Sequence, residues 1–476
     1  MKYRLPKDAF RAAWLPQEHQ DALVQEAETV VRETIEANEA FLDSESTFQN
    51  PSWRLVREKE GLRVYCQRRK SRRGSRTHGD QWRQESLLPA SQSSSWANPR
   101  YRGGGESVKG CEIGTERETA LSSKSAFAEN TIMERMKPSG VHLMALHGTM
   151  DGTLDDCMFG CFAPTDEAWK LRSLHINDRL DDSRIISTIH GPTQEDPFRF
   201  LGIKWFTKEN SAVLSSIVQQ RDFLIVESSG LTRDSKGERV GYFLMHSVTV
   251  LDVPELSGMG IVRGKMSFCS IFRQSRPGQL TVHSLGFFDT CGGIPSRVSV
   301  ALAAEGAISF VNVVDYAYIK KLAWLMRSKG EQSGKNSTLA SCCAACDKSF
   351  RKFSLSASRS GGACRICRQV FCAKCSVVKK MTVHVSDTST AKQCSFRFCL
   401  GCLLTAKKQS VWDMTSSANM NRPCSYRYHS DLPVPLATVE RASSSLLLLS
   451  CPTLELDCVD VFCRMAAEDQ AARGSS

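Results

Sequence analysis

The sequence lacks any long run of apolar residues. Its longest aliphatic run is the four leucines 446–449, flanked by serines, which is far short of the roughly 20 residues that a membrane-spanning helix needs. The first 16 residues mix Lys2, Arg4, Lys7 and Asp8 with single apolar residues and contain no continuous apolar stretch like that of a secretory signal. These absences predict a cytoplasmic protein.

The motifs on which many catalytic sites depend are also missing. The sequence has no glycine-rich phosphate-binding loop and no nucleophile elbow. Its 10 histidines are scattered, and His190 and His283 lie in strand-like patterns, where a core or surface histidine is the more common case. Sites made entirely of cysteine leave no open position on a metal for an activated water. We therefore expect a protein that is not an enzyme.

Acidic residues are scarce in one segment. Between positions 341 and 409 there are 13 Lys and Arg residues and two Asp residues, so this segment carries +11, the net charge of the whole chain. A basic surface of this density predicts an anionic partner, either a nucleic acid or a lipid head group. The segment has few aromatic residues for base stacking and no basic recognition helix, which makes nucleic acid the less favoured of the two.

The spacing of apolar residues indicates the secondary structure of the rest. It predicts an amphipathic helix over 16–42, a hairpin over 53–67 that turns at Glu60-Gly61, and a Ser-, Arg- and Gly-rich insertion over 71–136 that is mostly disordered. Pro295 opens a long helix to about 327 that is apolar around most of its circumference and must therefore be buried. Strands are expected over 141–150, 184–190, 198–206, 223–228, 239–251, 261–272 and 279–288.

One helix, a strand-rich middle and a long closing helix predict an α+β helix-grip domain. Three features carry a family resemblance: Trp53-Arg54-Leu55-Val56 leading to Gly61-Leu62-Arg63-Val64-Tyr65, the run Arg221-Asp222-Phe223, and the closing helix. Through them the sequence resembles the START-like lipid-transfer family over about residues 20–330. The resemblance implies an antiparallel sheet and a long C-terminal helix that enclose an apolar cavity for a lipid. A solid core in the same fold is the alternative.

Cysteine is concentrated in the same segment as positive charge. Ten of the 20 cysteines lie between 342 and 402, and eight of them form four Cys-x-x-Cys pairs: Cys343/Cys346, Cys364/Cys367, Cys372/Cys375 and Cys399/Cys402. Because such a pair brings two thiolates to one tetrahedral ion, four pairs predict two zinc ions per chain. The spacing allows sequential and interleaved pairing alike. Cys342 and Cys394 are expected to be ordinary small side chains.

The run 364–376, Cys-Arg-Ile-Cys-Arg-Gln-Val-Phe-Cys-Ala-Lys-Cys-Ser, resembles the core of a FYVE-type zinc finger. The resemblance covers about residues 340–406 and implies a small two-zinc cross-brace finger. In that family the first pair shares an ion with the third, and the second with the fourth. The resemblance therefore implies one site formed by Cys343, Cys346, Cys372 and Cys375, and another formed by Cys364, Cys367, Cys399 and Cys402.

The FYVE resemblance also implies contact with phosphatidylinositol 3-phosphate. Arg365 and Arg397 match arginines of the family pattern, and Arg359 and Lys352 are further candidates for contact with the head group. The family's paired histidines are replaced at 359–363, and its Trp-x-x-Asp element is absent before the first pair. Looser contact with anionic membrane is therefore favoured over recognition of that one head group. Phe353 and Leu355, flanked by basic residues, are candidates for a membrane loop.

The expected organisation is an N-terminal helical segment (1–49), a START-like domain (50–329), a linker (330–341), the finger (342–406) and a disordered tail (407–476). Removal of metal is expected to unfold 340–406 and to leave 141–330 folded.

The favoured function is that of a zinc-binding, lipid- or membrane-associated protein on the periphery of endosomal membranes. The expected partners are an apolar lipid in the START-like cavity and an anionic lipid or phosphoinositide at the finger. An adaptor that uses the finger to bind a partner protein is the alternative, and binding of nucleic acid is the least favoured.

Overall fold

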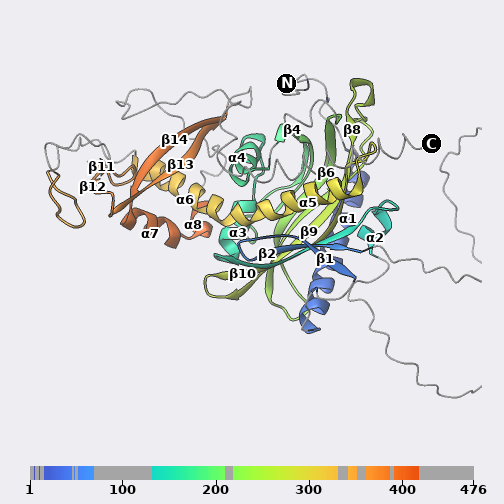
Figure 1. Ribbon diagram of the computed structural model, residues 1–476, viewed down its shortest axis with the longest axis horizontal. Coiled ribbons are helices and arrows are strands. Elements are labelled where there is room, and N and C mark those ends of the chain that lie inside the picture. Colours follow the sequence, from blue (N-terminus) through green and yellow to red (C-terminus); the bar gives the residue numbers. More distant parts are fainter. Residues whose placement is uncertain are drawn as a thin grey trace, which may run out of the picture.

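The computed structural model describes residues 5, 10, 15–44, 48, 52–68, 131–178, 180–208, 218–330, 341–350, 361–385 and 391–416. Their largest unit is an antiparallel sheet in the order β1-β2-β3-β10-β9-β7-β6-β5-β4, and the short β8 pairs in parallel with β6 (Figure 1). The strands are β1 (Trp53–Lys59), β2 (Leu62–Gln67), β3 (Leu143–Asp151), β4 (Leu180–His190), β5 (Phe200–Lys208), β6 (Arg221–Arg233), β7 (Arg239–Ser247), β8 (Val262–Arg263), β9 (Lys265–Arg276) and β10 (Gln279–Asp289).

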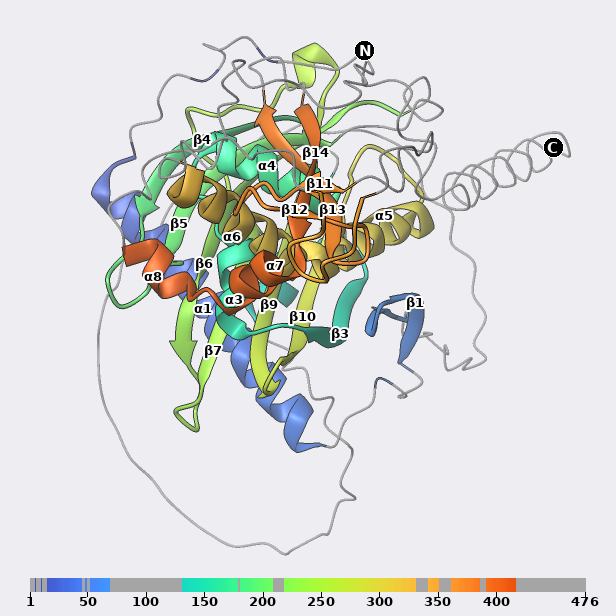
Figure 2. The same ribbon diagram turned by 90° about the vertical axis from the view of Figure 1, so that its left-hand side faces the viewer.

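Helices cover both faces of this sheet. On one face lies α1 (Gln17–Asp43), whose buried side chains, among them Val30, Thr34 and Phe41, recur at helical spacing. The other face is covered by α3 (Leu154–Cys161), α4 (Asp166–Ile176), α5 (Ser296–Ser309) and α6 (Val313–Gly330), as Figures 1 and 2 show. A short helix, α2 (Ile132–Met136), precedes β3.

Strand β10 illustrates why both faces can be apolar. Successive side chains of a strand point to opposite faces. Leu280 and Val282 join the core beneath α5 and α6, whereas Leu285 and Phe287 join the core beneath α1. The predicted α+β helix-grip fold, with its antiparallel sheet and C-terminal helices, is therefore confirmed.

The closing helix differs from the prediction in one respect. It is interrupted by a 3₁₀ turn, η2 (Phe310–Asn312), which separates α5 from α6. There the N–H of Phe310 is shared between the carbonyls of Ala307 and Ile308. The apolar pattern of the sequence could not show this change, because both helix types keep these side chains on nearly the same face.

Other expectations near the N-terminus have mixed outcomes. The hairpin β1–β2 turns at Glu60 and Gly61, both with positive φ, as a tight two-residue turn requires. The predicted N-terminal segment 1–49 is not a separate unit, because α1 packs on the sheet. Of the insertion 71–136, residues 71–130 lie outside the described residues, and the end of the insertion forms α2 rather than disordered chain.

The cysteine-rich segment forms a small finger. It contains two short hairpins, one between β11 (Gly362–Ala363) and β12 (Val370–Phe371) and one between β13 (Ser376–Val385) and β14 (Ala391–Cys399). Helix α7 (Leu400–Lys408) follows, and then α8 (Val411–Ser416). The start of the predicted tail, 407–476, is therefore helical and packed, not disordered. Residues 417–476 and nearly all of the linker, 331–340, lie outside the described residues.

Within the residues that the structure describes, one helical stretch, Ser296–Ser328, is long and apolar enough by length and composition to cross a membrane. This agrees with the absence of long apolar runs in the sequence, because the value that meets the criterion, a mean hydropathy of 1.5, is an average over 18 residues that include polar ones. In this fold the stretch comprises α5, η2 and α6, which pack on the sheet, and core helices pass the same test.

Candidate lipid cavity and metal centres

The structure brings the eight paired cysteines together in two groups of four. Within each group the sulfur atoms lie within 4.8 Å of one another. The grouping is the one that the FYVE resemblance implies, with the first pair joined to the third and the second to the fourth. The two groups are Cys343, Cys346, Cys372 and Cys375, and Cys364, Cys367, Cys399 and Cys402.

Sulfur spacing and chemistry both fit a tetrahedral zinc ion. Zn–S bonds of about 2.3 Å place tetrahedral sulfurs about 3.8 Å apart. The Sγ atoms of Cys346 and Cys372 are 3.7 Å apart, and those of Cys367 and Cys399 are 3.9 Å apart. A site of four cysteine thiolates is typical of structural zinc, because all four coordination positions of the ion are then filled by the protein.

Backbone N–H groups stabilise the negative charge of these sulfurs. The N–H of Cys372 donates to Cys343 Sγ (3.3 Å), and that of Cys399 donates to Cys364 Sγ (3.3 Å). The bond from Cys372 is the main cause that lowers the pKa of Cys343 to about 6. In the same group, contact with Cys346 raises the pKa of Cys375 to about 12. Four adjacent thiols cannot all ionise alone, so a cation is needed to hold four thiolates.

The finger packs against the outer side of α6. Ile319, Leu322 and Met326 of α6 share one apolar cluster with Cys343, Phe371 and Phe398 of the finger. Figure 2 shows α7 beside α6. The finger therefore packs on the helix-grip domain and shares an apolar core with it.

Polar contacts join the finger to the domain at two further places. Asp315 of α6 accepts from His175 of α4 (3.1 Å) and from Lys379 of β13 (3.5 Å), and these contacts, the one with His175 first, lower the pKa of Asp315. Lys321 of α6 pairs with Asp156 of α3 (2.5 Å) and donates to the carbonyl of Lys407 in α7 (3.4 Å).

Helix α8 returns the chain from the finger to the helix-grip domain. Trp412 meets Phe198 edge to face, with ring centroids 5.8 Å apart, and its indole N–H donates to Asp155 of α3 (3.0 Å). Val411 and Met414 are buried in the core beneath α5 and α6. A helix of six residues is too short to show a periodic pattern in the sequence.

Two of the arginines proposed for head-group contact lie together. The N–H of Arg365 donates to the carbonyl of Arg397 (2.8 Å), and the guanidinium of Arg397 donates to Ser376 (2.9 Å). Arg365 also lies over the ring of Phe396. The other proposed residues, Arg359, Lys352, Phe353 and Leu355, lie outside the described residues.

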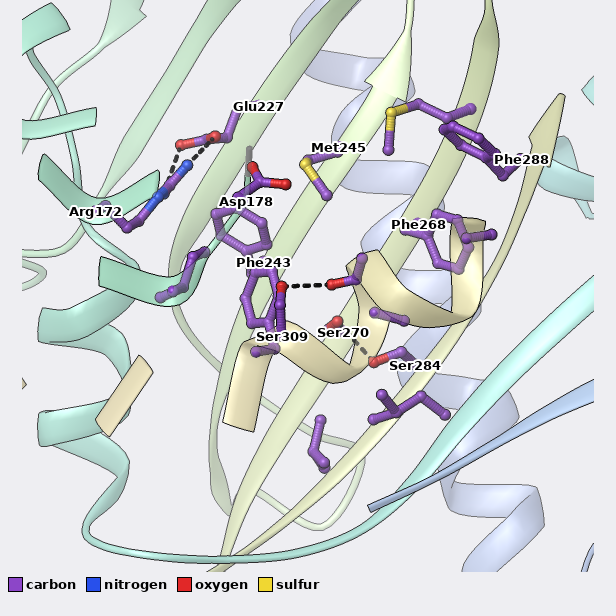
Figure 3. A pocket seen from close by; sticks show the side chains of 18 of the residues that line it. Arg172, Asp178, Glu227, Phe243, Met245, Phe268, Ser270, Ser284, Phe288 and Ser309 are labelled. Carbon is purple, nitrogen blue, oxygen red and sulfur yellow. Dashed lines mark hydrogen bonds and ion pairs between the residues drawn. The ribbon is translucent and has the colours of Figure 1, made fainter. Parts of the chain in front are cut away.

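The helix-grip domain contains an apolar cavity between α5 and the sheet. It comprises about 1040 Å³ of space not filled by atoms, part of which is open to solvent. Its apolar lining comes from the sheet, α4, α5 and η2 and includes Phe310. Figure 3 shows four other large side chains of the lining, Phe243, Met245, Phe268 and Phe288. The core beneath α5 is therefore not completely filled by side chains, which favours a cavity over the solid-core alternative.

A buried charge cluster adjoins the cavity, and two of its three members, Arg172 and Glu227, line it. Glu227 of β6 accepts from Arg172 of α4 (2.9 and 3.3 Å) and from Lys204 of β5 (2.6 Å). All three side chains are at most 4% exposed. Burial opposes ionisation of Glu227, but the charges of Arg172 and Lys204 outweigh it and lower the pKa of Glu227. Burial lowers the pKa of Lys204 to about 8.

Sequence analysis did not identify this cluster, although a signal was available. Lys204 interrupts the otherwise apolar run 200–206, and Glu227 follows the apolar run 223–226. A charge within a fully buried strand is rare unless it is paired. Nothing in the sequence indicated Arg172, because α4 brings it to the pair from 55 residues away.

A second polar constellation resembles a catalytic triad but is enclosed. His246 lies 2.8 Å from Ser267 Oγ and 3.3 Å from Glu26 of α1. Ser267 and His246 are fully buried, and neither lines the cavity. These contacts join α1 to strands β7 and β9, which is a structural role.

Comparison with known proteins gives limited information. No family model and no curated protein match the chain. Similar solved structures include human STARD10 (12% identity, 62% of this chain, 88% of that chain, TM-score 0.32) and human StAR-related lipid transfer protein 5 (15%, 63%, 97%, 0.34). Another is the lipid transfer and protein localization domain of human StarD13 (9%, 64%, 98%, 0.31). At these TM-scores the likeness carries no argument, and the fold class rests on the sheet order and helix placement described above.

Proposed function

We propose that this protein is a non-enzymatic lipid-binding protein that holds two zinc ions and lies on the cytoplasmic side of membranes, including endosomal ones. The observation that carries the proposal is the apolar cavity enclosed by the sheet and α5. A cavity lined by aromatic and aliphatic side chains would take the apolar part of a lipid, because moving that surface out of water is favourable.

Lipid binding is tested by extracting the purified full chain and identifying co-purified lipids by mass spectrometry. Ala307→Trp places a large side chain in the cavity, since Ala307 lines it from α5. Arg297→Trp adds the same side chain at an exposed position of the same helix. We expect the first variant to lose bound lipid and the second to retain it. Equal lipid content in both, or none in the parent, would contradict the proposal.

The FYVE-type finger is proposed to contact anionic membrane or a phosphoinositide through Phe353, Leu355 and the surrounding basic residues. Each cation near an anionic surface contributes about 1 kcal/mol, so binding should be weak and should fall as salt is added. The double change Phe353→Ser with Leu355→Ser should reduce sedimentation with phosphatidylserine vesicles and leave the zinc content at two ions.

An adaptor role for the finger is favoured by one observation. Leu400 and Leu404, four residues apart on α7, are 46% and 58% exposed and form an apolar pair on the helix surface. The double change Leu400→Ser with Leu404→Ser is the matched control for the Phe353/Leu355 pair in the vesicle assay, because it also replaces two apolar side chains of the finger with serine. If this pair of changes abolishes sedimentation and the Phe353/Leu355 pair does not, the loop is not the membrane contact.

A further inference from the structure

Helix α7 of the finger has one apolar side that the described residues leave exposed. Cys402 and Ala406 are buried in the cluster shared with α6, and Leu403 packs on the same cluster. Leu400 and Leu404 lie on the other side of the helix and are 46% and 58% exposed. Because residues four apart are neighbours on a helix surface, these two leucines form one stripe, called here the α7 stripe.

Lysines flank the α7 stripe at both ends. Lys407 and Lys408 end the helix. At its start, the N–H of Leu400 donates to the carbonyl of Cys375 (3.1 Å), which brings the backbone of Lys374 close to the stripe. Among the residues that the structure describes, none of these three flanking lysines takes part in an ion pair.

Neighbouring carboxylates do not neutralise this charge. Asp155 and Asp156 of α3 are paired with Arg239 and Lys321. Asp413 of α8, five residues beyond the end of α7, offsets at most one of the three charges. The α7 stripe is therefore an apolar surface with surplus positive charge at its ends.

The described part of the finger presents a narrow apolar stripe and no broad apolar face. Its other large apolar side chains with high exposure are Val377 and Val378 of β13. Successive side chains of a strand point to opposite faces, so these two valines do not form one patch. From Leu400 to Leu404 the helix advances about 6 Å. A stripe this short and one side chain wide fits a peptide segment better than a bilayer.

One segment of the same chain has the complementary chemistry. Residues 454–462, Leu-Glu-Leu-Asp-Cys-Val-Asp-Val-Phe, combine three carboxylates with five large apolar side chains and contain no Lys or Arg. In the rest of 417–476 there are four acidic residues against five Lys and Arg residues. Carboxylates and apolar side chains in one short segment match an apolar stripe between lysines.

The segment 454–462 also begins within reach of α7. Helix α8 follows α7 after two residues and ends at Ser416, so at most about 25 Å of chain separates Leu404 from Ser416. A flexible chain of 37 residues, the length of 417–453, spans about 33 Å. Tethers of this length give an effective concentration in the millimolar range, so even a contact of millimolar affinity would be occupied about half of the time.

We infer that residues 454–462 dock on the α7 stripe of their own chain, with their carboxylates at the flanking lysines and their apolar side chains on the two leucines. This contact rests neither on the lipid cavity nor on membrane binding. It covers the face on which the adaptor role depends, so a partner protein would have to displace the segment.

Zero-length crosslinking of the purified full chain tests the contact. A carbodiimide joins a lysine to a carboxylate where the two touch, and mass spectrometry of the peptides identifies each pair. We expect links from the carboxylates of 454–462 to the flanking lysines. The exposed ion pairs Lys236–Asp43 (3.2 Å) and Lys379–Asp315 (3.5 Å) are internal positive controls. In a mixture of ¹⁵N-labelled and unlabelled protein, the expected links join peptides of one label only.

Variants of the full chain locate the docking face. Leu400→Ser with Leu404→Ser should lower the yield of these links about threefold or more, because the apolar part of the contact is lost. Leu174→Ser with Leu251→Ser, at exposed positions of α4 and of the loop after β7, is the matched control and should leave the yield unchanged. Both variants should keep two zinc ions, which elemental analysis checks.

Four results would overturn the inference. Absence of links from 454–462, while both control pairs are linked, refutes the contact. Links between differently labelled chains would make a second copy the occupant. An unchanged yield in the Leu400/Leu404 variant would show that the α7 stripe is not the docking face. If hydrogen exchange of α7 slows only when phosphatidylserine vesicles are added, and no links form, a membrane covers the stripe instead.

Discussion

Removing a metal ligand from the finger should also destabilise the helix-grip domain, because the two share α6. We compare Cys372→Ala with Cys394→Ala, a cysteine of the same finger that belongs to neither group of four. The first change takes one thiolate from a four-ligand site, so the chain should lose zinc and the finger should unfold. The second removes only a partly buried side chain, and both ions should remain.

The size of the effect follows from α6. Ile319, Leu322, Leu325 and Met326 are between 2% and 8% exposed and pack in the cluster shared with the finger. Burial of such a side chain contributes about 1.5–3 kcal/mol. The four together contribute up to about 6–12 kcal/mol, against a total of about 5–15 kcal/mol for a whole domain. A loss of only about 3 kcal/mol should lower the melting temperature by about 6–12 °C.

The measurements are zinc content by elemental analysis, thermal unfolding, and hydrogen exchange of peptides from α6. We expect Cys372→Ala to exchange faster along α6 and to melt at a lower temperature than Cys394→Ala. This revises the expectation from sequence alone that 141–330 would stay folded without metal. If Cys372→Ala loses zinc while α6 exchange and melting match those of Cys394→Ala, the reasoning from a shared core is wrong.

Three further predictions concern stability. Trp412→Ala removes a ring contact and the bond to Asp155, and chemical unfolding should show a loss of about 3 kcal/mol with zinc unchanged; an unchanged midpoint would mean that α8 is not held there. His283 is fully buried and its pKa is lowered to about 3 by burial, so it stays neutral when folded while the unfolded chain takes up a proton below about pH 6.5. The free energy of unfolding should therefore fall by about 2 kcal/mol between pH 7 and 5, because only the unfolded chain gains a proton at His283. His283→Leu should remove that part of the pH dependence of stability, and identical pH profiles of the two proteins would contradict the prediction. Gly160→Ala would place a Cβ 2.1 Å from the carbonyl oxygen of Val313, so α3 and α6 must separate and the melting temperature should fall by several degrees, whereas unchanged melting would show that the helices can move apart at no cost.

Features that depend on short stretches of chain followed from the sequence. The turn at Glu60-Gly61 needs only two residues that accept positive φ. The strands of the large sheet needed only alternation or a short apolar run. The finger needed only four cysteine pairs, because each pair lies within four consecutive residues. Such features depend only on residues that are close in the sequence, so they can be predicted without knowing what packs against them.

Tertiary structure alone decided how these pieces meet. The spacing of the cysteines left the pairing open, and chain folding brought Cys343 to Cys372 and Cys364 to Cys399. The charge cluster needed α4 to carry Arg172 onto a strand far along the chain. Because the finger packs on α6, this one helix contributes side chains to two apolar cores. Contacts between residues that are distant in the sequence produce no periodic pattern and no fixed spacing in the sequence. Only the folded chain could therefore determine them.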